Sequence, residues 1–138
     1  MSERPVPALD GPCLAAWAAR ARDELAAARE EIDDLNVYPV PDGDTGTNLH
    51  LTVCSAVEAL DEQRHGAAEP DLADQAAALA RGALLGARGN SGVILAQLLR
   101  GFADTVTHGQ APAGPELVAT ALKAAADDAY DAVATPVE

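Results

Sequence analysis

The amino-acid sequence predicts an all-helical protein, an up-and-down antiparallel bundle of about five helices in a single domain over residues 1–138. Of its 138 residues, 49% are hydrophobic, which is enough for one core, and the chain is too short for two comfortable domains. Aromatic residues make up only 3% and alanine supplies much of the apolar content, so closely packed helices are favoured over sheets. Apolar residues recur at helical spacing in successive segments.

The first predicted helix is long and amphipathic, and it follows a polar stretch, residues 1–12, that we expect to be disordered. Pro39 and Pro41 forbid continuation of this helix, and each biases the preceding residue toward extended geometry. We therefore expect an ordered loop over residues 36–46, rich in oxygen atoms. The apolar stripe of the helix consists of Leu14, Trp17, Ala21, Leu25, Ala28, Ile32 and Leu35.

The remaining apolar segments predict a second to a fifth helix in the same way. A glycine-rich cluster, residues 86–92, interrupts the pattern between the third and fourth helices, and the fourth is the most apolar. A loop over residues 107–114 precedes the fifth helix, with Pro115 suited to a first helical position and Pro136 as a stop. The four helices are expected over residues 49–60, 72–83, 93–106 and 115–133.

The charge of the chain limits its partners. Its 22 acidic and 9 basic residues give a net charge of -13, which repels nucleic acid and anionic membrane surfaces. Lys123 is the single lysine, so divalent cations or backbone amides must supply the positive field if phosphates are bound. No apolar run approaches membrane-spanning length and the N-terminal residues lack a leader pattern, so we expect a cytoplasmic protein without a transmembrane segment. Cys13 and Cys54 fit neither a zinc site nor a redox pair.

Two aspartates in the loop over residues 36–46 are the first candidate for chemistry. Asp42 and Asp44 flank Gly43, so a sharp turn there could direct both carboxylates at one hard cation such as magnesium. The alternative is that one aspartate caps the following helix and the other is solvated, and the bare pattern favours that alternative. A calcium loop of the EF-hand type is excluded, because Gly46 and Val53 occupy positions that need oxygen ligands.

The glycine-rich cluster is the second candidate. Its backbone amides, with Asn90 and Ser91 at the start of the next helix, could cradle phosphate oxygens, and Arg88 could add charge. A tight helix–helix turn with Ser91 as N-cap is an equally good interpretation. Thr47 and Asn48 offer a second amide-rich helix start. No P-loop or Rossmann motif is present, and the acidic pairs, Asp33-Asp34 among them, are expected on solvated helix faces without a role.

Two long segments resemble a known family. The segment from Leu35 to Asn48 resembles the metal-binding loop of the DhaL-type kinase superfamily, which includes the nucleotide-binding domain of dihydroxyacetone kinase. The segment from Gly86 to Leu95 is similar to the phosphate loop of that family, and the resemblance runs from about Leu14 to Glu138. Two prolines, and Thr45 where dihydroxyacetone kinases carry histidine, are typical of the ATP-binding domain of the fatty-acid-kinase branch.

The resemblance implies an eight-helix barrel of about 200 residues, a usual size for one domain, so the five readable helices suggest a domain truncated at its C-terminus. It implies ATP and magnesium as cofactors, with Asp42 and Asp44 as catalytic magnesium ligands and Asn36 as a third metal contact. The nucleotide-binding positions implied by the two motifs are Thr45, Thr47, Asn48, Gly89, Asn90, Ser91 and Gly92.

The function implied is a kinase that transfers the γ-phosphoryl group of ATP to an acceptor held by a partner protein. The acceptor would be a fatty acid on a separate DegV-like fatty-acid-binding protein, giving an acyl phosphate, or dihydroxyacetone, giving glycerone kinase activity. The alternative is a non-catalytic regulatory or interaction module that keeps the DhaL-type fold. We also expect both loops at one end of the bundle, and exposed apolar side chains along the first and fifth helices or beside the fourth, which pairing into a homodimer would cover.

Overall fold

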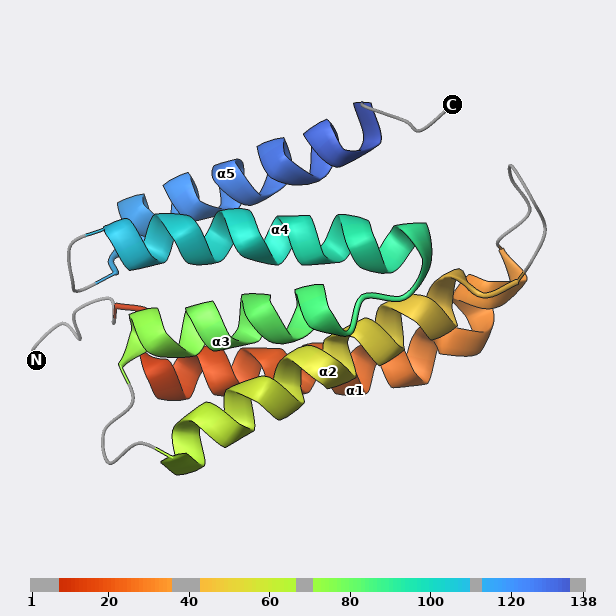
Figure 1. The fold of residues 1–138 in the computed structure, drawn as a ribbon, viewed down its shortest axis with the longest axis horizontal. Coiled ribbons are helices and arrows are strands. Elements are labelled where there is room, and N and C mark those ends of the chain that lie inside the picture. Colours follow the sequence, from red (N-terminus) through yellow and green to blue (C-terminus); the bar gives the residue numbers. More distant parts are fainter. Residues whose placement is uncertain (1–7, 36–42, 67–70, 110–112, 135–138) are drawn as a thin grey trace, which may run out of the picture.

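The computed structural model describes residues 8–35, 43–66, 71–109 and 113–134. This part of the chain contains five α-helices and no β-strand beyond one isolated bridge, which confirms the all-helical prediction. Consecutive helices pack side by side in alternating directions (Figure 1), as in an up-and-down bundle. The helices are α1 (Gly11–Asp34), α2 (Thr45–Gly66), α3 (Leu72–Leu85), α4 (Gly89–His108) and α5 (Pro115–Ala134).

The prediction of disorder over residues 1–12 is wrong for residues 8–12, while residues 1–7 lie outside the described part. The Asp10 carboxylate accepts a hydrogen bond from the Cys13 amide at 2.8 Å, and Pro12 stands in the first turn, so α1 has both a cap and a start signal. The Leu9 amide donates to the Ala113 carbonyl at 2.8 Å and ties this segment to the residues before α5.

Several helix boundaries also differ from the prediction; α4, for example, continues to His108, two residues into the expected loop over residues 107–114. The helix α2 begins at Thr45, so the end of the expected loop over residues 36–46 is helical, and residues 36–42 lie outside the described part. The helix α4 begins at Gly89, inside the expected glycine-rich loop. Glycine has a low helix propensity, which hides these first turns in the sequence, and contacts with neighbouring helices outweigh that propensity here.

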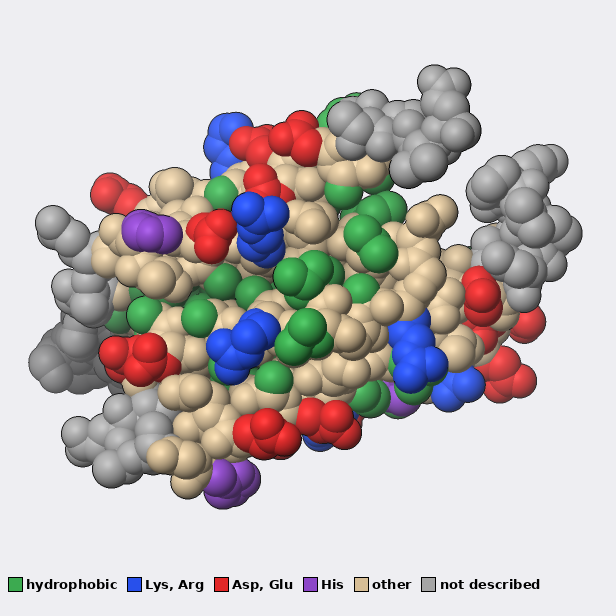
Figure 2. Space-filling view, in the orientation of Figure 1, with side chains coloured by type: hydrophobic (Ala, Val, Ile, Leu, Met, Phe, Trp, Pro, Cys, Tyr) green, Lys and Arg blue, Asp and Glu red, His purple; other side chains and the backbone are tan. Residues whose placement is uncertain are grey.

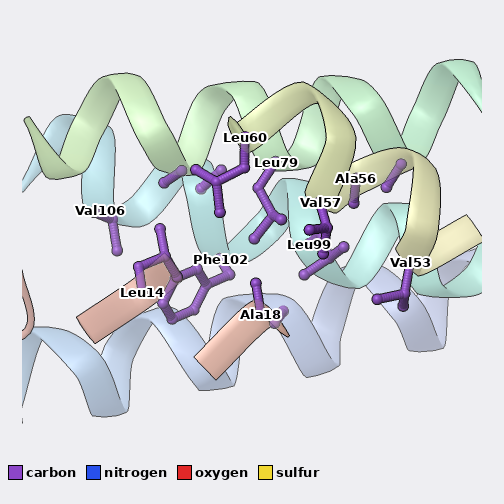
Figure 3. Packing of buried hydrophobic residues seen from close by; sticks show 14 of the residues in the cluster. Leu14, Ala18, Val53, Ala56, Val57, Leu60, Leu79, Leu99, Phe102 and Val106 are labelled. Carbon is purple, nitrogen blue, oxygen red and sulfur yellow. The ribbon is translucent and has the colours of Figure 1, made fainter. Parts of the chain in front are cut away.

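The core draws on all five helices, with Ala121 and Ala125 contributed by α5, and consists largely of alanine with a few larger side chains. Figure 3 shows Leu14 of α1 beside Phe102 of α4, with Leu60 and Leu79 approaching from α2 and α3. The rings of Trp17 and Phe102 are 6.3 Å apart between centroids. Small residues at most interior positions allow the helices to approach closely, as the alanine-rich composition predicts.

The bundle is open along one side. In the described part, α5 packs against α4 alone among the helices, and no helix contact joins α1 to α5. The predicted apolar surface on the first and fifth helices is present, since the side chains of Trp17, Leu122, Tyr130 and Val133 are about half exposed or more. No helix in the described ranges is both long and apolar enough to cross a bilayer.

Candidate functional site

The two candidate loops meet at one end of the bundle. Because neighbouring helices alternate in direction, the ends of α1 and α3 and the starts of α2 and α4 lie together there (Figure 1). The prediction that both loops share an end is therefore confirmed for the described residues. The start of α2 follows the aspartate loop, and the start of α4 lies in the glycine-rich cluster.

Gly89 brings the two motifs into direct contact. Its φ of 69° lies in the left-handed region that side chains other than glycine rarely adopt. A Cβ atom at this position would lie 2.4 Å from Nδ2 of Asn48, which leaves no room for a side chain. The start of α4 therefore packs directly on the Asn48 side chain of α2, and two positions predicted to bind nucleotide are adjacent in space.

Thr52 fixes the turn between α3 and α4 onto α2. Its side chain is fully buried, its hydroxyl donates to the Asn48 carbonyl at 2.7 Å, and it accepts from the Arg88 amide at 3.1 Å. A Cβ atom on Gly92 would lie 2.4 Å from the same hydroxyl oxygen. Nothing in the sequence marks Thr52, which stands one turn after Asn48, beyond the end of the motif.

We expect Thr52→Val to destabilise the protein by about 1 kcal/mol, because the change leaves the Arg88 amide without its acceptor in a partly buried place. Urea denaturation gives the free energy of unfolding. Thr120→Val is the matched control, since the exposed Thr120 hydroxyl also donates to a carbonyl one turn earlier, that of Glu116, and holds no second element. Equal losses in the two variants would show that Thr52 contributes only its local helix bond.

Asp33 caps the start of α2 from the end of α1. Its carboxylate accepts from the Thr47 amide at 3.0 Å and from the Thr47 hydroxyl at 2.7 Å. The Thr47 hydroxyl also accepts from Nε of Arg29 at 3.0 Å. The expectation that Asp33 is a solvated residue without a role is wrong, because the chain reversal places it at a helix N-terminus where anions are favoured.

This cap bears on the predicted role of Thr47. Its amide and hydroxyl are both engaged by protein groups, so the carboxylate of Asp33 stands where an anion would bind at the start of α2. Nucleotide contact by Thr47 stays a prediction, and so does contact by Thr45, which is half-buried in the same turn. The observed contacts make Thr47 a link between α1 and α2.

The hydrogen bonds from the Thr47 hydroxyl and amide lower the pKa of Asp33 below its ordinary value of 3.8. A carboxyl group whose pKa is lower in the folded state stabilises that state above its unfolded pKa and loses this contribution as the pH falls through the folded pKa. We therefore expect Asp33→Asn to melt below the wild-type protein at pH 7 and the difference to shrink below pH 3.8. Thermal melts at a series of pH values measure this difference in melting temperature, with Asp34→Asn as the control. A difference that stays constant across pH would contradict a stabilising role of the ionised Asp33 carboxylate.

The start of α4 is built differently from the starts of α1 and α3. Asp10 and Asp71 cap α1 and α3 through their side chains, whereas Arg88 stands at the N-cap of α4 and makes no side-chain cap bond. Ser91 lies inside the first turn, so the interpretation of Ser91 as N-cap is wrong. The first intrahelical bond runs from the Gly92 amide to the Arg88 carbonyl, which leaves the amides of Gly89, Asn90 and Ser91 pointing out of the helix start.

The aspartate loop is described only at its end. Gly43 has a φ of 68°, in the left-handed region that favours glycine, and Asp44 follows it directly before α2, with its carbonyl accepting from the Asn48 amide at 2.8 Å. Asp42 and Asn36 lie outside the described residues. Within the described ranges no group of three or more His, Cys, Asp or Glu residues could hold a metal ion, and the magnesium site stays a prediction.

The chain matches a known protein family and is similar to several bacterial proteins. Residues 39–138 match the family model described as DAK2 domain, which covers most of the chain. The chain is 42% identical over 130 residues to Protein YloV of Bacillus subtilis (strain 168), and 39% and 38% identical to uncharacterized proteins of Staphylococcus saprophyticus and Staphylococcus aureus (strain USA300). Each alignment covers 94% of this chain and 23% of the relative, so the chain spans about a quarter of the length of these proteins.

Proposed function

Since the chain belongs to the DAK2 domain family, whose domains are of the dihydroxyacetone kinase type, we propose that it binds ATP with magnesium and transfers the γ-phosphoryl group to an acceptor presented by a partner protein. The observation that carries the proposal is the contact of Gly89 with Asn48, which joins the start of α4 to the start of α2 directly after Asp44. The described residues of both motifs therefore lie next to each other, at the starts of α2 and α4.

The start of α4 suits the phosphates. Outward-pointing amides at a helix N-terminus favour negative charge, and this helix start has no side-chain cap that would compete with a phosphate oxygen. The Asn48 side chain fills the space beside Gly89, so a ligand would meet the amides at the open end of the helix, where Asn90 is exposed. In this proposal Gly89, Asn90, Ser91 and Gly92 orient the phosphate chain.

Asp42 and Asp44, with Asn36 as a further contact, would hold the magnesium ion. When bound, magnesium neutralises charge on the phosphate oxygens, which is its usual contribution to phosphoryl transfer. A chain with net charge -13 and one lysine needs such a cation to bind ATP, so the composition agrees with the proposal. Catalysis then comes from the positioning of ATP and acceptor and from the electrostatic field of the bound magnesium ion. The hydrogen bonds between Asp33 and Thr47 hold the start of α2 in place.

The acceptor we favour is a fatty acid carried by a DegV-like protein, and the product is then an acyl phosphate. Two observations support this choice over dihydroxyacetone. The loop carries Thr45 and two prolines, the pattern of the fatty-acid-kinase branch, and a carboxylate acceptor needs no general base, which neither motif offers. Because the reaction consumes ATP, we place it in the cytoplasm.

A thermal-shift titration with ATP, with and without magnesium, tests the proposal. A ligand that binds only the folded state raises the melting temperature, and at 100 times its dissociation constant the gain is about 2.7 kcal/mol. We expect a rise with ATP and magnesium together and little change with ATP alone. No rise would overturn the proposal, while a rise without transfer to a fatty-acid-loaded DegV-like protein or to dihydroxyacetone would favour the non-catalytic alternative.

A further inference from the structure

The outer face of α3 and α4 carries exposed apolar side chains beside the candidate site. Leu84 and Leu85 at the end of α3 are 55% and 81% exposed, and Val93 in the first turns of α4 is 45% exposed. Arg81 and Arg88 are exposed next to them in the sequence. Figure 2 shows hydrophobic side chains over α3 and α4 with basic side chains near them. We call Arg81, Leu84, Leu85, Arg88 and Val93 the α3–α4 patch.

The open side of the bundle does not account for this patch. The helix α3 has α2 and α4 as its neighbours, and α4 has α3 and α5, so both helices are already flanked. A further helix added to the bundle beside α1 or α5 would cover residues such as Trp17 and Leu122 instead. Whatever covers the α3–α4 patch must dock on the outside of the bundle. Large apolar residues that are exposed next to each other, as Leu84 and Leu85 are, often mark an interaction surface.

The charges of the patch indicate the chemistry of its occupant. In the described part of the chain Arg81 and Arg88 form no ion pair with a carboxylate, and neither do Arg29 and Arg64. Arg20, Arg22, Arg100 and Lys123 each form one. The guanidinium groups of Arg81 and Arg88 are therefore available to carboxylates of another molecule, beside the exposed apolar side chains of Leu84 and Leu85. A protein surface with acidic side chains around an apolar centre complements this arrangement, and the overall charge disfavours an anionic membrane as the occupant.

The position of the patch connects it to phosphoryl transfer. Arg88 is the N-cap residue of α4, and the amides proposed to hold the phosphates follow it directly. An acceptor atom must come within about 3–3.5 Å of the phosphorus to react, so the protein that carries the acceptor must cover the surface beside this helix start. Building on the proposed function, we propose that the α3–α4 patch is the docking surface for the acceptor-presenting protein, which places an apolar contact on Leu84 and Leu85 and acidic side chains on Arg81 and Arg88.

The test compares charge-reversed and control variants in the transfer assay, with saturating ATP and magnesium and a fatty-acid-loaded DegV-like protein as the varied substrate. We expect Arg81→Glu and Leu85→Glu to raise the KM for that protein at least tenfold and to leave kcat and the ATP-dependent thermal shift unchanged. Arg20→Glu and Leu122→Glu, at exposed positions on α1 and α5 away from the patch, should leave the KM unchanged. Added salt should raise the wild-type KM and affect Arg81→Glu less, because salt screens exposed charges.

The outcomes separate the two proposals. Transfer at wild-type KM in both patch variants would overturn the docking surface and leave the proposed function intact. Absence of an ATP-dependent thermal shift in the wild-type chain would overturn the proposed function itself. Concentration-dependent self-association that Leu85→Glu abolishes, with an unchanged KM, would show that the patch joins two copies of this chain and would also overturn the docking proposal.

Discussion

Asp44→Asn is expected to abolish magnesium-dependent phosphoryl transfer while the helices stay folded, and Asp42→Asn is expected to do the same. Each change removes one anionic oxygen ligand from the proposed cation, and the chain has few cationic side chains that could replace the ion at the phosphates. The effect on folding should be small and slightly stabilising, because two carboxylates aimed at one point repel each other when no metal is bound. Circular dichroism and the transfer assay measure the two effects separately.

Asp34→Asn is the matched control for this prediction, because Asp34 is an exposed carboxylate at the end of α1 with no role in the proposed site. It should transfer phosphate at the wild-type rate. Loss of helical signal in Asp44→Asn would show that Asp44 stabilises the start of α2 instead of holding a metal. Full activity in both aspartate variants would refute the magnesium assignment.

Gly89→Ala is expected to lower the affinity for ATP with magnesium at least tenfold. A left-handed backbone costs a residue with a side chain about 1–2 kcal/mol, and the added Cβ would meet the Asn48 side chain 2.4 Å away. Relief of this clash requires the start of α4 to move away from α2, which separates the parts of the proposed phosphate site. Calorimetric titration of ATP with magnesium measures the affinity.

Gly66→Ala controls for the loss of glycine itself, because a Cβ atom at the exposed end of α2 would meet nothing within 4 Å. The control should bind ATP as the wild-type chain does. If Gly89→Ala also bound ATP normally and melted at the wild-type temperature, the contact between the two motifs would not matter for the nucleotide.

Two features could be predicted from the sequence. The helices follow from the spacing of apolar residues, and the proximity of the two motifs follows from the alternating directions of neighbouring helices. The apolar stripe from Leu14 onward marks α1, and alternating helix directions bring the start of α2 to the start of α4. The first turns at Thr45 and Gly89 were missed, since threonine and glycine are weak helix formers and tertiary contacts fix these turns.

Asp33 and Thr52 could not be predicted because their partners are distant in sequence. Asp33 stands in an acidic run and binds Thr47, 14 residues away, so nothing in its local pattern separates it from Asp34. Thr52 accepts from the Arg88 amide, 36 residues away, and looks like an ordinary position on a helix. Such contacts become visible only once the packing of α1 on α2 and of α3 on α2 is known.

The attachment of α5 to α4 alone has a consequence for how the protein opens. A helix with one neighbour can detach as a separate cooperative unit, at a free energy below that of global unfolding. The contacts that build the site join α1 to α2 and α2 to the start of α4, and none of them involves α5. Amide protons of α5 should therefore exchange with solvent through a partial opening in which the candidate site remains assembled.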